Sequence, residues 1–510
     1  MKNRVLVFAL SAVLVLCGAC VGLGTFVWNR LVMDTTGKVD FANALAVPPL
    51  AASRLDAAGR RVFDLRPGEG RHDFGRGSVP TWGFNGAYLG PTLRAARGER
   101  VVINVHNELP ETTTVHWHGM HLPATMDGGP YQPIAPGETW SPTWEIDQPA
   151  ATLWYHPHPH GETASHVYRG LAGMFIVDDP GTSVAVLPHR YGVDDFPVIV
   201  QDKQFTDDGE LDEGRSFLGD IGIRGDTIAV NGTVGPYLDV TTERVRLRLL
   251  NGSNARSYEF GFADDRSFAV VGTDGGLLPE PFGTTRIALS PGERAEIVVT
   301  VGPGERPVLR STPPPLGLDP LSNRFSGGAD TLDILQLRAA DRLTASEALP
   351  SRLVQVPRLD PAQATQRRSF RLSDRAINGE RMDMTRIDAT AVKDTVEIWR
   401  LTNNDGSPHS FHIHDVQFQV LTADGRTPPP QLLGWKDTLF LRPNVPYEII
   451  VPFTDYTDPA VPYMFHCHVL YHEDQGMMGQ FVVVEPGQHA GTPAGAPGHL
   501  HGRSTPSTTL

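Results

Sequence analysis

Three segments of the chain repeat one pattern of apolar and polar positions. They begin at Asn85, Asn231 and Asn378, and the first reads "NGAYLGPTLRAARGERVVINVHNELP". Each segment has an Asn-Gly turn, an extended stretch, a charged turn and a strand of alternating apolar residues. A proline turn that leads into a further strand follows in each segment, as "APGETWSPTWEI", "SPGERAEIVVTV" and "RPNVPYEIIVPF". The repetition predicts three homologous β-domains.

The repeats predict where these domains lie. We expect domains over residues 47–185, 190–345 and 365–486, and a disordered, low-complexity tail over 487–510. The chain contains 52 glycines and 43 prolines, spread over many turns, as all-β sandwiches or barrels require. The sequence therefore predicts an all-β protein of three consecutive domains.

The N-terminus carries an apolar run that differs from the rest of the chain. Residues 5–28 have no charge, and Lys2, Arg4 and Arg30 flank them. A helix of this length can cross a hydrocarbon core of about 30 Å. We therefore predict a signal-anchor over residues 1–30, membrane attachment through it, and an extracytoplasmic location for the remainder. A cleaved signal peptide and a lipid-modified Cys20 are the alternatives.

Charge excludes one class of partner. The net charge is −14, and the sequence has no cluster of lysine and arginine that could bind a phosphate backbone. We therefore expect no nucleic-acid partner.

Cysteine and histidine are distributed unevenly. Beyond the N-terminal run, Cys467 is the one remaining cysteine, so it cannot form an intrachain disulfide. No histidine lies between Arg190 and Pro408, whereas "HWHG", "HPH", "HSFHIH" and "HCHVLYH" begin at positions 116, 156, 409 and 466. This distribution places the chemistry in the first and third domains.

Alternation along strands divides these clusters into two sites. His466 and His468 project to one face of a strand and Cys467 to the other. Cys467 with His409, His472 and a weak axial Met477 describes a blue-copper electron-transfer site. The other eight histidines of the four motifs form an all-imidazole site, which suits copper, zinc or iron.

The other histidines have a simpler interpretation. We interpret five of them as structural: His106, His121, His160, His166 and His189. The tail histidines His489, His499 and His501 are interpreted as solvated.

The motifs HxHG, HxH, HxxHxH and HCHxxxHxxxxM, in this order, resemble those of the multicopper oxidases, in particular the three-domain bacterial laccase and cuprous-oxidase branch. The resemblance implies three cupredoxin-like Greek-key β-sandwich or barrel domains and four copper ions per chain. The implied type 1 ligands are His409, Cys467, His472 and Met477. The implied type 2 ligands are His116 and His412, and the implied type 3 ligands are His118, His156, His158, His414, His466 and His468.

The resemblance also implies a reaction. A small reductant would give single electrons to the type 1 copper, and the trinuclear cluster would reduce dioxygen to water. Cys467 is covalently continuous with His466 and His468, which gives electrons a short bonded path. Asp127 and Glu473 match the acids that deliver protons to bound oxygen, a role open to carboxylates within hydrogen-bond reach.

One departure bears on the reductant. The methionine-rich insert of cuprous oxidases is absent where "FRLSDRAINGERMDM" runs, and Ser407 replaces a methionine of those enzymes, although Asp405 fits their acidic position. We therefore expect a monomeric oxidase of phenol-like or other small organic reductants. The alternatives are a cuprous oxidase for copper tolerance and a copper-free structural or cell-division factor, against which the complete ligand set speaks.

Overall fold

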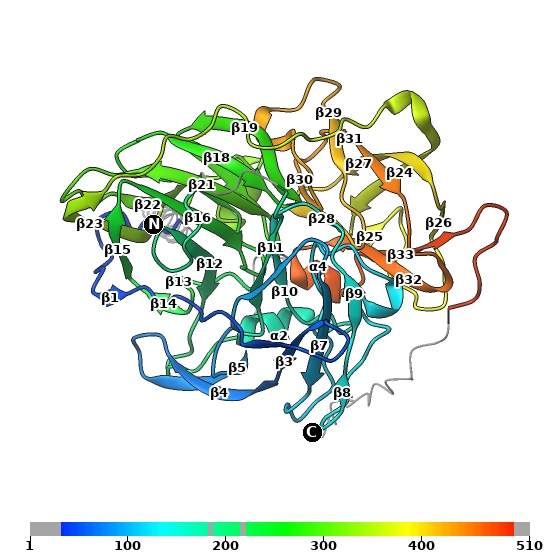
Figure 1. The fold of residues 1–510 in the computed structure, drawn as a ribbon, viewed down its shortest axis with the longest axis horizontal. Helices are drawn as coiled ribbons and strands as arrows, with labels where there is room; N and C mark the ends of the chain where they lie inside the picture. Colours follow the sequence, from blue (N-terminus) through cyan, green and yellow to red (C-terminus); the bar gives the residue numbers. More distant parts are fainter. Residues whose placement is uncertain (1–31, 182–186, 215–220, 494–510) are drawn as a thin grey trace, which may run out of the picture.

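The computed structural model describes residues 32–181, 187–214 and 221–493, and these residues form mostly β-structure (Figure 1). The predicted signal-anchor and residues 494–510 of the predicted tail lie outside the described residues. Within the described part of the chain, no helix combines the length and apolarity needed to cross a membrane. The sheets fall into three sets, which follow one another along the chain except that the first strand, β1 (Asn43–Ala44), joins a sheet of the middle set.

The first set surrounds a core that includes Phe63, Val101 and Trp117. One sheet contains β2 (Ser53–Leu55), β3 (Arg61–Leu65), β7 (Arg100–His106), β8 (Thr139–Trp140) and β9 (Thr143–Glu145). The other contains β10 (Ala151–Tyr155), β11 (Gly173–Asp178) and β6 (Leu93–Ala96). The hairpin of β4 (Pro67–Asp73) and β5 (Ser78–Phe84) lies beside them.

The middle set has the largest sheets. One sheet has the order β1 (Asn43–Ala44), β15 (Pro236–Thr242), β23 (Leu332–Thr344), β22 (Val308–Thr312), β17 (Tyr258–Phe262) and β20 (Arg286–Leu289). The other has the order β14 (Thr233–Val234), β13 (Thr227–Val230), β12 (Asp195–Lys203), β16 (Arg244–Asn251), β21 (Arg294–Thr300), β18 (Phe268–Thr273) and β19 (Gly276–Thr284). A cluster that includes Phe196, Leu247 and Ile297 forms their core.

The third set also consists of two sheets. One sheet has the order β25 (Ala376–Ile377), β24 (Ala364–Ser373), β27 (Thr395–Asn403), β31 (Tyr447–Phe453) and β29 (Gln419–Ala423). The other has the order β26 (Ala389–Val392), β33 (Met478–Val484), β32 (Asp458–Cys467), β28 (His409–Ile413) and β30 (Thr438–Leu441). Short α-helices complete the described fold: α2 (Thr163–Arg169), α3 (Pro320–Phe325) and α4 (Leu470–Asp474).

The predicted repeat recurs in the local structure. Asn85, Asn231 and Asn378 all have a positive φ, between 49° and 57°, which asparagine tolerates better than most residues. In each turn the side-chain oxygen accepts a backbone N–H and the side-chain amide donates to a backbone carbonyl, as Asn85 does with Arg66 and Asp64. The boundaries proposed for the three domains stay predictions.

A second asparagine also recurs, at the end of a strand in each set. The side-chain amides of Asn107, Asn251 and Asn403 each donate to two backbone carbonyls, and each side-chain oxygen accepts the N–H two residues later. These bonds satisfy polar groups that would otherwise be buried unpaired, because all three asparagines are buried. In the third set this arrangement fixes the loop that leads directly into His409.

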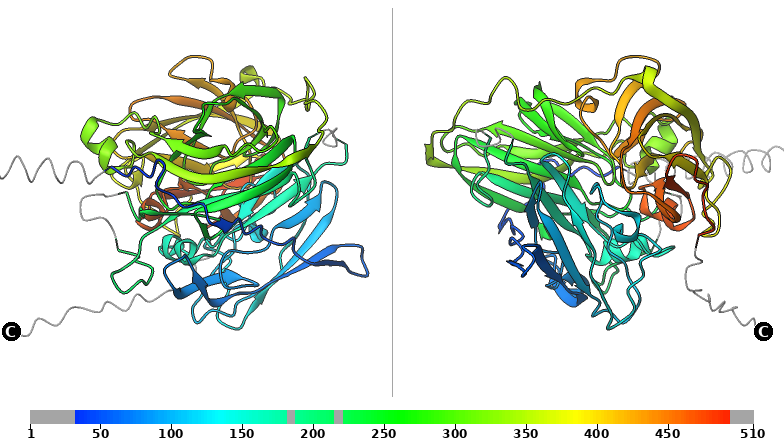
Figure 2. Two further views of the ribbon diagram at one scale, coloured as in Figure 1. Left: turned by 90° about the vertical axis from the view of Figure 1, so that its left-hand side faces the viewer. Right: turned by 45° about the vertical axis from the view of Figure 1, so that its right-hand side comes forward.

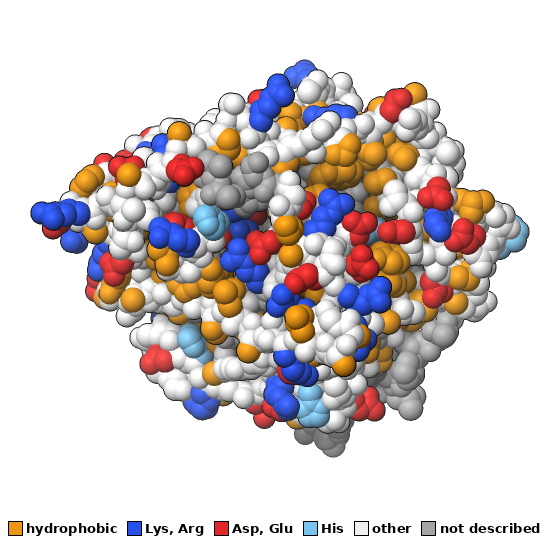
Figure 3. Space-filling model, in the orientation of Figure 1, with side chains coloured by type: hydrophobic (Ala, Val, Ile, Leu, Met, Phe, Trp, Pro, Cys, Tyr) orange, Lys and Arg blue, Asp and Glu red, His pale blue; other side chains and the backbone are white. Residues whose placement is uncertain are grey.

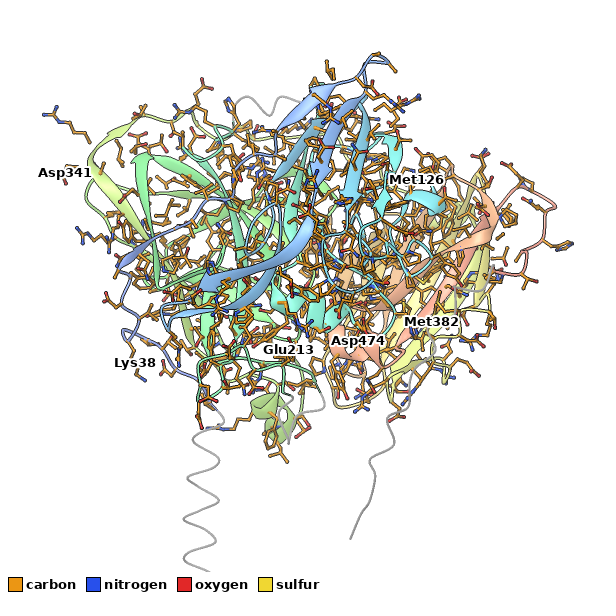
Figure 4. The ribbon with its side chains drawn as sticks, turned by 90° about the horizontal axis from the view of Figure 1, so that it is seen from below. Lys38, Met126, Glu213, Asp341, Met382 and Asp474 are labelled. Atoms are coloured by element: carbon orange, nitrogen blue, oxygen red, sulfur yellow. The ribbon has the colours of Figure 1, made fainter. Side chains whose placement is uncertain are left out.

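The three sets meet at the centre of the molecule. Figure 2 shows the first set in blue and cyan and the third in yellow to orange, both lying against the green middle set. Strands β10 and β28 and helix α4 lie at this junction in Figure 1. Both oxygens of Asp474 on α4 accept backbone N–H groups of α2, at 2.9 and 3.0 Å, where the first and third sets meet (Figure 4). Acidic and basic side chains are interspersed on the face in Figure 3.

Candidate metal centre

Backbone pairing aligns the histidine motifs. His116 and His156 exchange backbone hydrogen bonds of 2.8 and 3.1 Å in an antiparallel bridge of the first set. In the third set, β28 pairs with β32 so that His412 lies opposite His466 and Phe411 opposite Cys467. Side chains alternate along a strand, so these pairings direct histidines to one side and Cys467 to the other.

Histidines of the first and third sets converge on one buried site, here called the imidazole cluster. Its members are His116, His118, His156, His158, His412, His414, His466 and His468, and none is more than 1% exposed. Nε2 of His466 lies 3.2 Å from Nε2 of both His158 and His414. Three groups within the cluster could each hold a metal ion: His116, His118 and His412; His118, His156 and His468; and His158, His414 and His466.

Several outer ring nitrogens of the cluster have acceptors. Nδ1 of His156 and of His412 donate to the backbone oxygens of Pro157 and Asp437, at 2.8 and 2.9 Å. A proton on the outer nitrogen leaves the inner nitrogen with its lone pair, which is the form that binds metals. The cluster therefore presents several lone pairs to one another at short range, and a bound cation would relieve their repulsion.

The protonation state of the histidines and their missing hydrogen bonds also indicate a metal site. Burial and the neighbouring imidazoles lower the pKa of His118, His156, His412 and His414 well below the usual value. Burial also lowers the pKa of His468 to about 3, and neither of its ring nitrogens has a hydrogen-bond partner among the described residues. Neutral imidazoles with unsatisfied nitrogens fit a metal site.

A second group, here called the thiolate site, lies on the other side of β32. Its members are His409, Cys467, His472 and Met477. Sγ of Cys467 lies 3.5 Å from Nδ1 of His409 and 3.7 Å from Nδ1 of His472. Burial opposes ionisation of the thiol, but His409 and His472 outweigh it and lower the pKa of Cys467 to about 5. Met477 is fully buried in the same apolar cluster as Cys467. Two imidazoles, a thiolate and a nearby thioether form the donor set of a blue-copper site.

Two buried carboxylates touch the imidazole cluster. Oδ2 of Asp127 lies 2.7 Å from Nδ1 of His414. Oε2 of Glu473 lies 3.0 Å from Nδ1 of His466, and Oε1 lies 3.5 Å from Nδ1 of His158. Burial alone would raise the pKa of Glu473, but these two histidines hold it well below its usual value. Both predicted acids thus lie beside histidines of the cluster.

Asp405 lies at the edge of the thiolate site. Its Oδ1 is 3.0 Å from Nε2 of His409, and 23% of its side chain is exposed. Burial lowers the pKa of His409, but Cys467 and Asp405 outweigh that effect and raise it to about 9.

Several histidines outside the two sites have other partners. Nε2 of His166 lies 3.0 Å from Glu111, and Nδ1 of His106 lies 2.7 Å from Thr139. His121 lies between two carboxylates, 3.0 Å from Asp415 and 2.6 Å from Asp455.

The middle set also reaches the imidazole cluster, which the sequence interpretation missed. Its turn at Ser290–Arg294 places Gly292 against the ring of His468, and Arg294 contacts Asp437, whose carboxylate lies 3.1 Å from His118. The signal available in the sequence was the proline turn "SPGERAE", because a proline turn lies at the corresponding position of all three repeats. The absence of histidine from the middle repeat concealed this contribution.

Comparisons with known proteins agree with this geometry. Family models described as multicopper oxidase match residues 69–182, 211–306 and 353–487. The chain is 37% identical to cell division protein FtsP of Xenorhabdus nematophila, over 86% of this chain and 92% of the relative. It is 36% identical to multicopper oxidase mco of Staphylococcus haemolyticus, with the same coverage.

Solved structures give the same result. The laccase-like multicopper oxidase CueO from the lignin-degrading bacterium Ochrobactrum sp. matches with 38% identity and a TM-score of 0.78, over 86% of this chain and all of that one. The multicopper oxidase from Pediococcus acidilactici matches with 35% identity and a TM-score of 0.78, over 87% of this chain and 92% of that one. The mostly-β, cupredoxin-like fold and the sequence both show that the chain belongs to the multicopper oxidase family.

Proposed function

We propose that this protein is an oxidase that couples one-electron oxidation of phenol-like or other small organic reductants to the reduction of dioxygen to water. Family membership implies copper binding, oxidoreductase activity and, in general, dioxygen and a reductant as substrates. The observation that carries the proposal is the pairing of the thiolate site with the imidazole cluster through one segment, His466–Cys467–His468.

The proposed copper complement is four ions per chain. One would be held by the thiolate site and three by the imidazole cluster, with His116 and His412 holding one ion and the other six histidines of the cluster holding the remaining two. When bound, copper would supply the redox chemistry, with single electrons entering at the thiolate site and four-electron reduction of dioxygen at the cluster. Nδ1 of His409 and of His472 would bind metal beside Sγ of Cys467. The backbone that joins Cys467 to His466 and His468 would link the sites covalently.

Asp127 and Glu473 would hold and deliver protons at the imidazole cluster. Each is at most 2% exposed, and each contacts histidines of the cluster rather than solvent. A carboxylate in this position can transfer a proton directly or through one water molecule.

Three observations favour an organic reductant over Cu(I). Ser407 provides no thioether beside Asp405, and the chain has no methionine-rich insert between β24 and β27. The similar protein from Ochrobactrum sp. has oxidase activity towards lignin model compounds and lignosulfonate. Cu(I) oxidation in copper tolerance is the alternative within the same family.

A second candidate function is a role in cell division without catalysis. The similarity to FtsP, at 37% identity, supports this candidate. The complete donor sets of both sites oppose it, since a protein without metal has no need of inward-facing lone pairs. An extracytoplasmic location, anchoring through residues 1–30 and a monomeric state are further parts of the proposal.

The decisive experiment measures copper per chain, the visible spectrum and dioxygen consumption on the purified protein. We expect about four copper ions, an intense blue band from thiolate-to-Cu(II) charge transfer, and a higher kcat/KM for a phenol than for Cu(I). A copper-loaded protein that consumes no dioxygen with either reductant would support the non-catalytic candidate. A higher kcat/KM for Cu(I) would reverse the choice of reductant.

A further inference from the structure

The turn at Ser290–Arg294 forms part of the wall of the imidazole cluster. Gly292 has a φ of +85°, and a Cβ atom there would lie 2.9 Å from Cγ of His468. Any larger residue would therefore be strained and would push against the ring. The N–H of Gly292 donates to the backbone oxygen of Asn251 at 3.0 Å, which fixes the turn to the end of β16.

Arg294, at the end of this turn, connects all three sets of sheets. It is fully buried, and its Nη1 and Nη2 donate to Oδ1 and Oδ2 of Asp437 at 2.6 and 2.7 Å. Its Nε donates to the backbone oxygen of Thr152 on β10, at 3.0 Å. A bidentate pair of this kind fixes both the position and the plane of the carboxylate.

Asp437 transmits this position to two histidines of the cluster. Oδ1 of Asp437 and Oγ1 of Thr438 both lie 3.1 Å from Nε2 of His118. The backbone oxygen of Asp437 accepts Nδ1 of His412 at 2.9 Å, and the rings of His118 and His412 stack with centroids 3.7 Å apart.

His118 is oriented differently from its neighbours. It points Nδ1 inward, 3.3 Å from Nε2 of His156, whereas His116, His156, His158, His412, His414 and His466 point Nε2 at another ring of the cluster. Asp437 and Thr438 account for this reversal, because their oxygens accept the proton on Nε2 of His118 and leave the lone pair on Nδ1.

The segment that carries Asp437 is anchored a second time by the middle set. Nζ of the buried Lys436 lies 2.8 Å from Oδ2 of Asp274 and 3.0 Å from Oε1 of Glu293. Glu293 belongs to the same turn as Arg294, so the turn holds Lys436 and Asp437 together.

From these contacts we propose that Arg294 and Asp437 are positioning residues for the metal centre, through which the histidine-free middle set orients His118 and His412 for metal binding. This inference rests on the proposed function, because it concerns the copper held by the imidazole cluster. Hydrogen-bonding partners of ligating histidines commonly contribute 10-fold to 100-fold in metal affinity.

The test compares two variants with a matched control. Arg294→Lys keeps the charge but loses the bidentate geometry, and Asp437→Asn removes the carboxylate at nearly constant volume. Arg248→Lys makes the same change at another buried pair of the middle set, in which Arg248 contacts both oxygens of Asp195 at 2.7 and 2.9 Å. The other side-chain partners of Arg248, Glu296 and Oγ1 of Thr152, are not members of the imidazole cluster. Copper per chain is measured after dialysis against chelators of graded affinity, and the blue band reports the thiolate site separately.

We expect both variants to lose cluster copper at 10-fold to 100-fold lower chelator strength while the blue band stays, and the control to match the parent. Parental retention of cluster copper in both variants would overturn the proposal. So would an equal loss of the blue band and of cluster copper in the variants and in Arg248→Lys, which would indicate general destabilisation.

A third variant avoids disturbing the buried charges. Thr438→Val removes the hydroxyl 3.1 Å from His118 and 3.2 Å from Nδ1 of His412 at almost unchanged size. We expect a smaller loss in the same direction, and unchanged retention would count against the proposal even if the charge variants fail to fold. A parent protein with no copper beyond the blue ion would instead refute the proposed function, before any variant is made.

Discussion

Oδ2 of Asp127 lies 2.7 Å from Nδ1 of His414, although 287 positions separate the two residues in the chain. The first set supplies the carboxylate and the third set supplies the imidazole. Glu473 makes the opposite connection, since it belongs to the third set and lies 3.5 Å from His158 of the first. Each acid therefore lies where the two halves of the cluster meet.

Replacing either acid by its amide should slow the reaction with dioxygen. Asp127→Asn and Glu473→Gln are expected to keep the blue band and to stay loaded with copper when no chelator is present, because neither residue is a proposed ligand. Like Asp437, each carboxylate contacts a histidine of the cluster, so both variants should lose cluster copper at a lower chelator strength than the parent. Reoxidation should slow by about 10²-fold, at the low end of what acid–base catalysis contributes. Stopped-flow reoxidation by dioxygen measures this directly.

The control is anaerobic reduction of the thiolate site by substrate, which requires no proton at the cluster and should stay at the parental rate in both variants. If both variants reoxidise at the parental rate with full copper, the proton-transfer roles are wrong. Loss of copper in either variant without chelator would indicate a structural role instead.

Replacing Cys467 by serine should separate the two sites. A serine hydroxyl does not form the thiolate–Cu(II) bond, so Cys467→Ser is expected to lose the blue band and turnover. The imidazole cluster lies on the other side of β32 and should keep most of its copper, as measured by metal analysis. A Cys467→Ser protein that is still blue and active would refute the assignment of the thiolate site.

Met477 and Met478 provide a test at adjacent positions. Both are buried, but only Met477 belongs to the apolar cluster that contains Cys467, whereas Met478 pairs with His466 on β33. A thioether donates weakly to Cu(II), so Met477→Leu should stay blue and raise the reduction potential. Met478→Leu is the control, and redox titration measures both. A shift in Met478→Leu alone would mean that the axial ligand has been placed one position too early.

His121 should make stability depend on pH. Burial opposes its charge, but Asp415 and Asp455 outweigh that effect and hold the pKa of His121 well above its usual value. Because the pKa is raised in the folded state, the stabilisation is complete below about pH 6.5, the ordinary histidine pKa, and is lost as pH rises through the folded value. His121→Gln should therefore lower the free energy of unfolding by about 1–3 kcal/mol at pH 6 and by less in alkaline solution.

Chemical denaturation at several pH values tests this trend. His106→Gln is a matched control, since the ring of His106 contacts the hydroxyl of Thr139 rather than a carboxylate. A difference between parent and His121→Gln that grows with rising pH would contradict the prediction.

Much of the site could be predicted because it depends on local geometry. The strand period of two separates Cys467 from His466 and His468, and the Asn-Gly turns at Asn85, Asn231 and Asn378 mark the repeats wherever the sheets lie. Residue spacing alone was sufficient for these features, since each depends on neighbours in the chain.

The contribution of the middle set could not be predicted in the same way. Arg294 and Asp437 are both charged residues on strands or turns, and nothing in their local sequence indicates that they pair in the interior. Their meeting depends on how the middle and third sets pack, which is a long-range property. The contacts of His121 could not be predicted for the same reason, because Asp415 and Asp455 approach it from the third set.

The division of the imidazole cluster between the first and third sets also constrains when copper can be acquired. A ribosome completes the histidines that follow β7 long before it reaches β28 and β32, so the growing polypeptide carries at first only one or two of the three histidines of each group. Whether folding accompanies translation or follows export, tight metal binding has to await the C-terminal strands. A polypeptide truncated before Cys467 lacks both the thiolate and His468, so we expect it to complete neither site, and copper binding would then distinguish the finished protein from a truncated one.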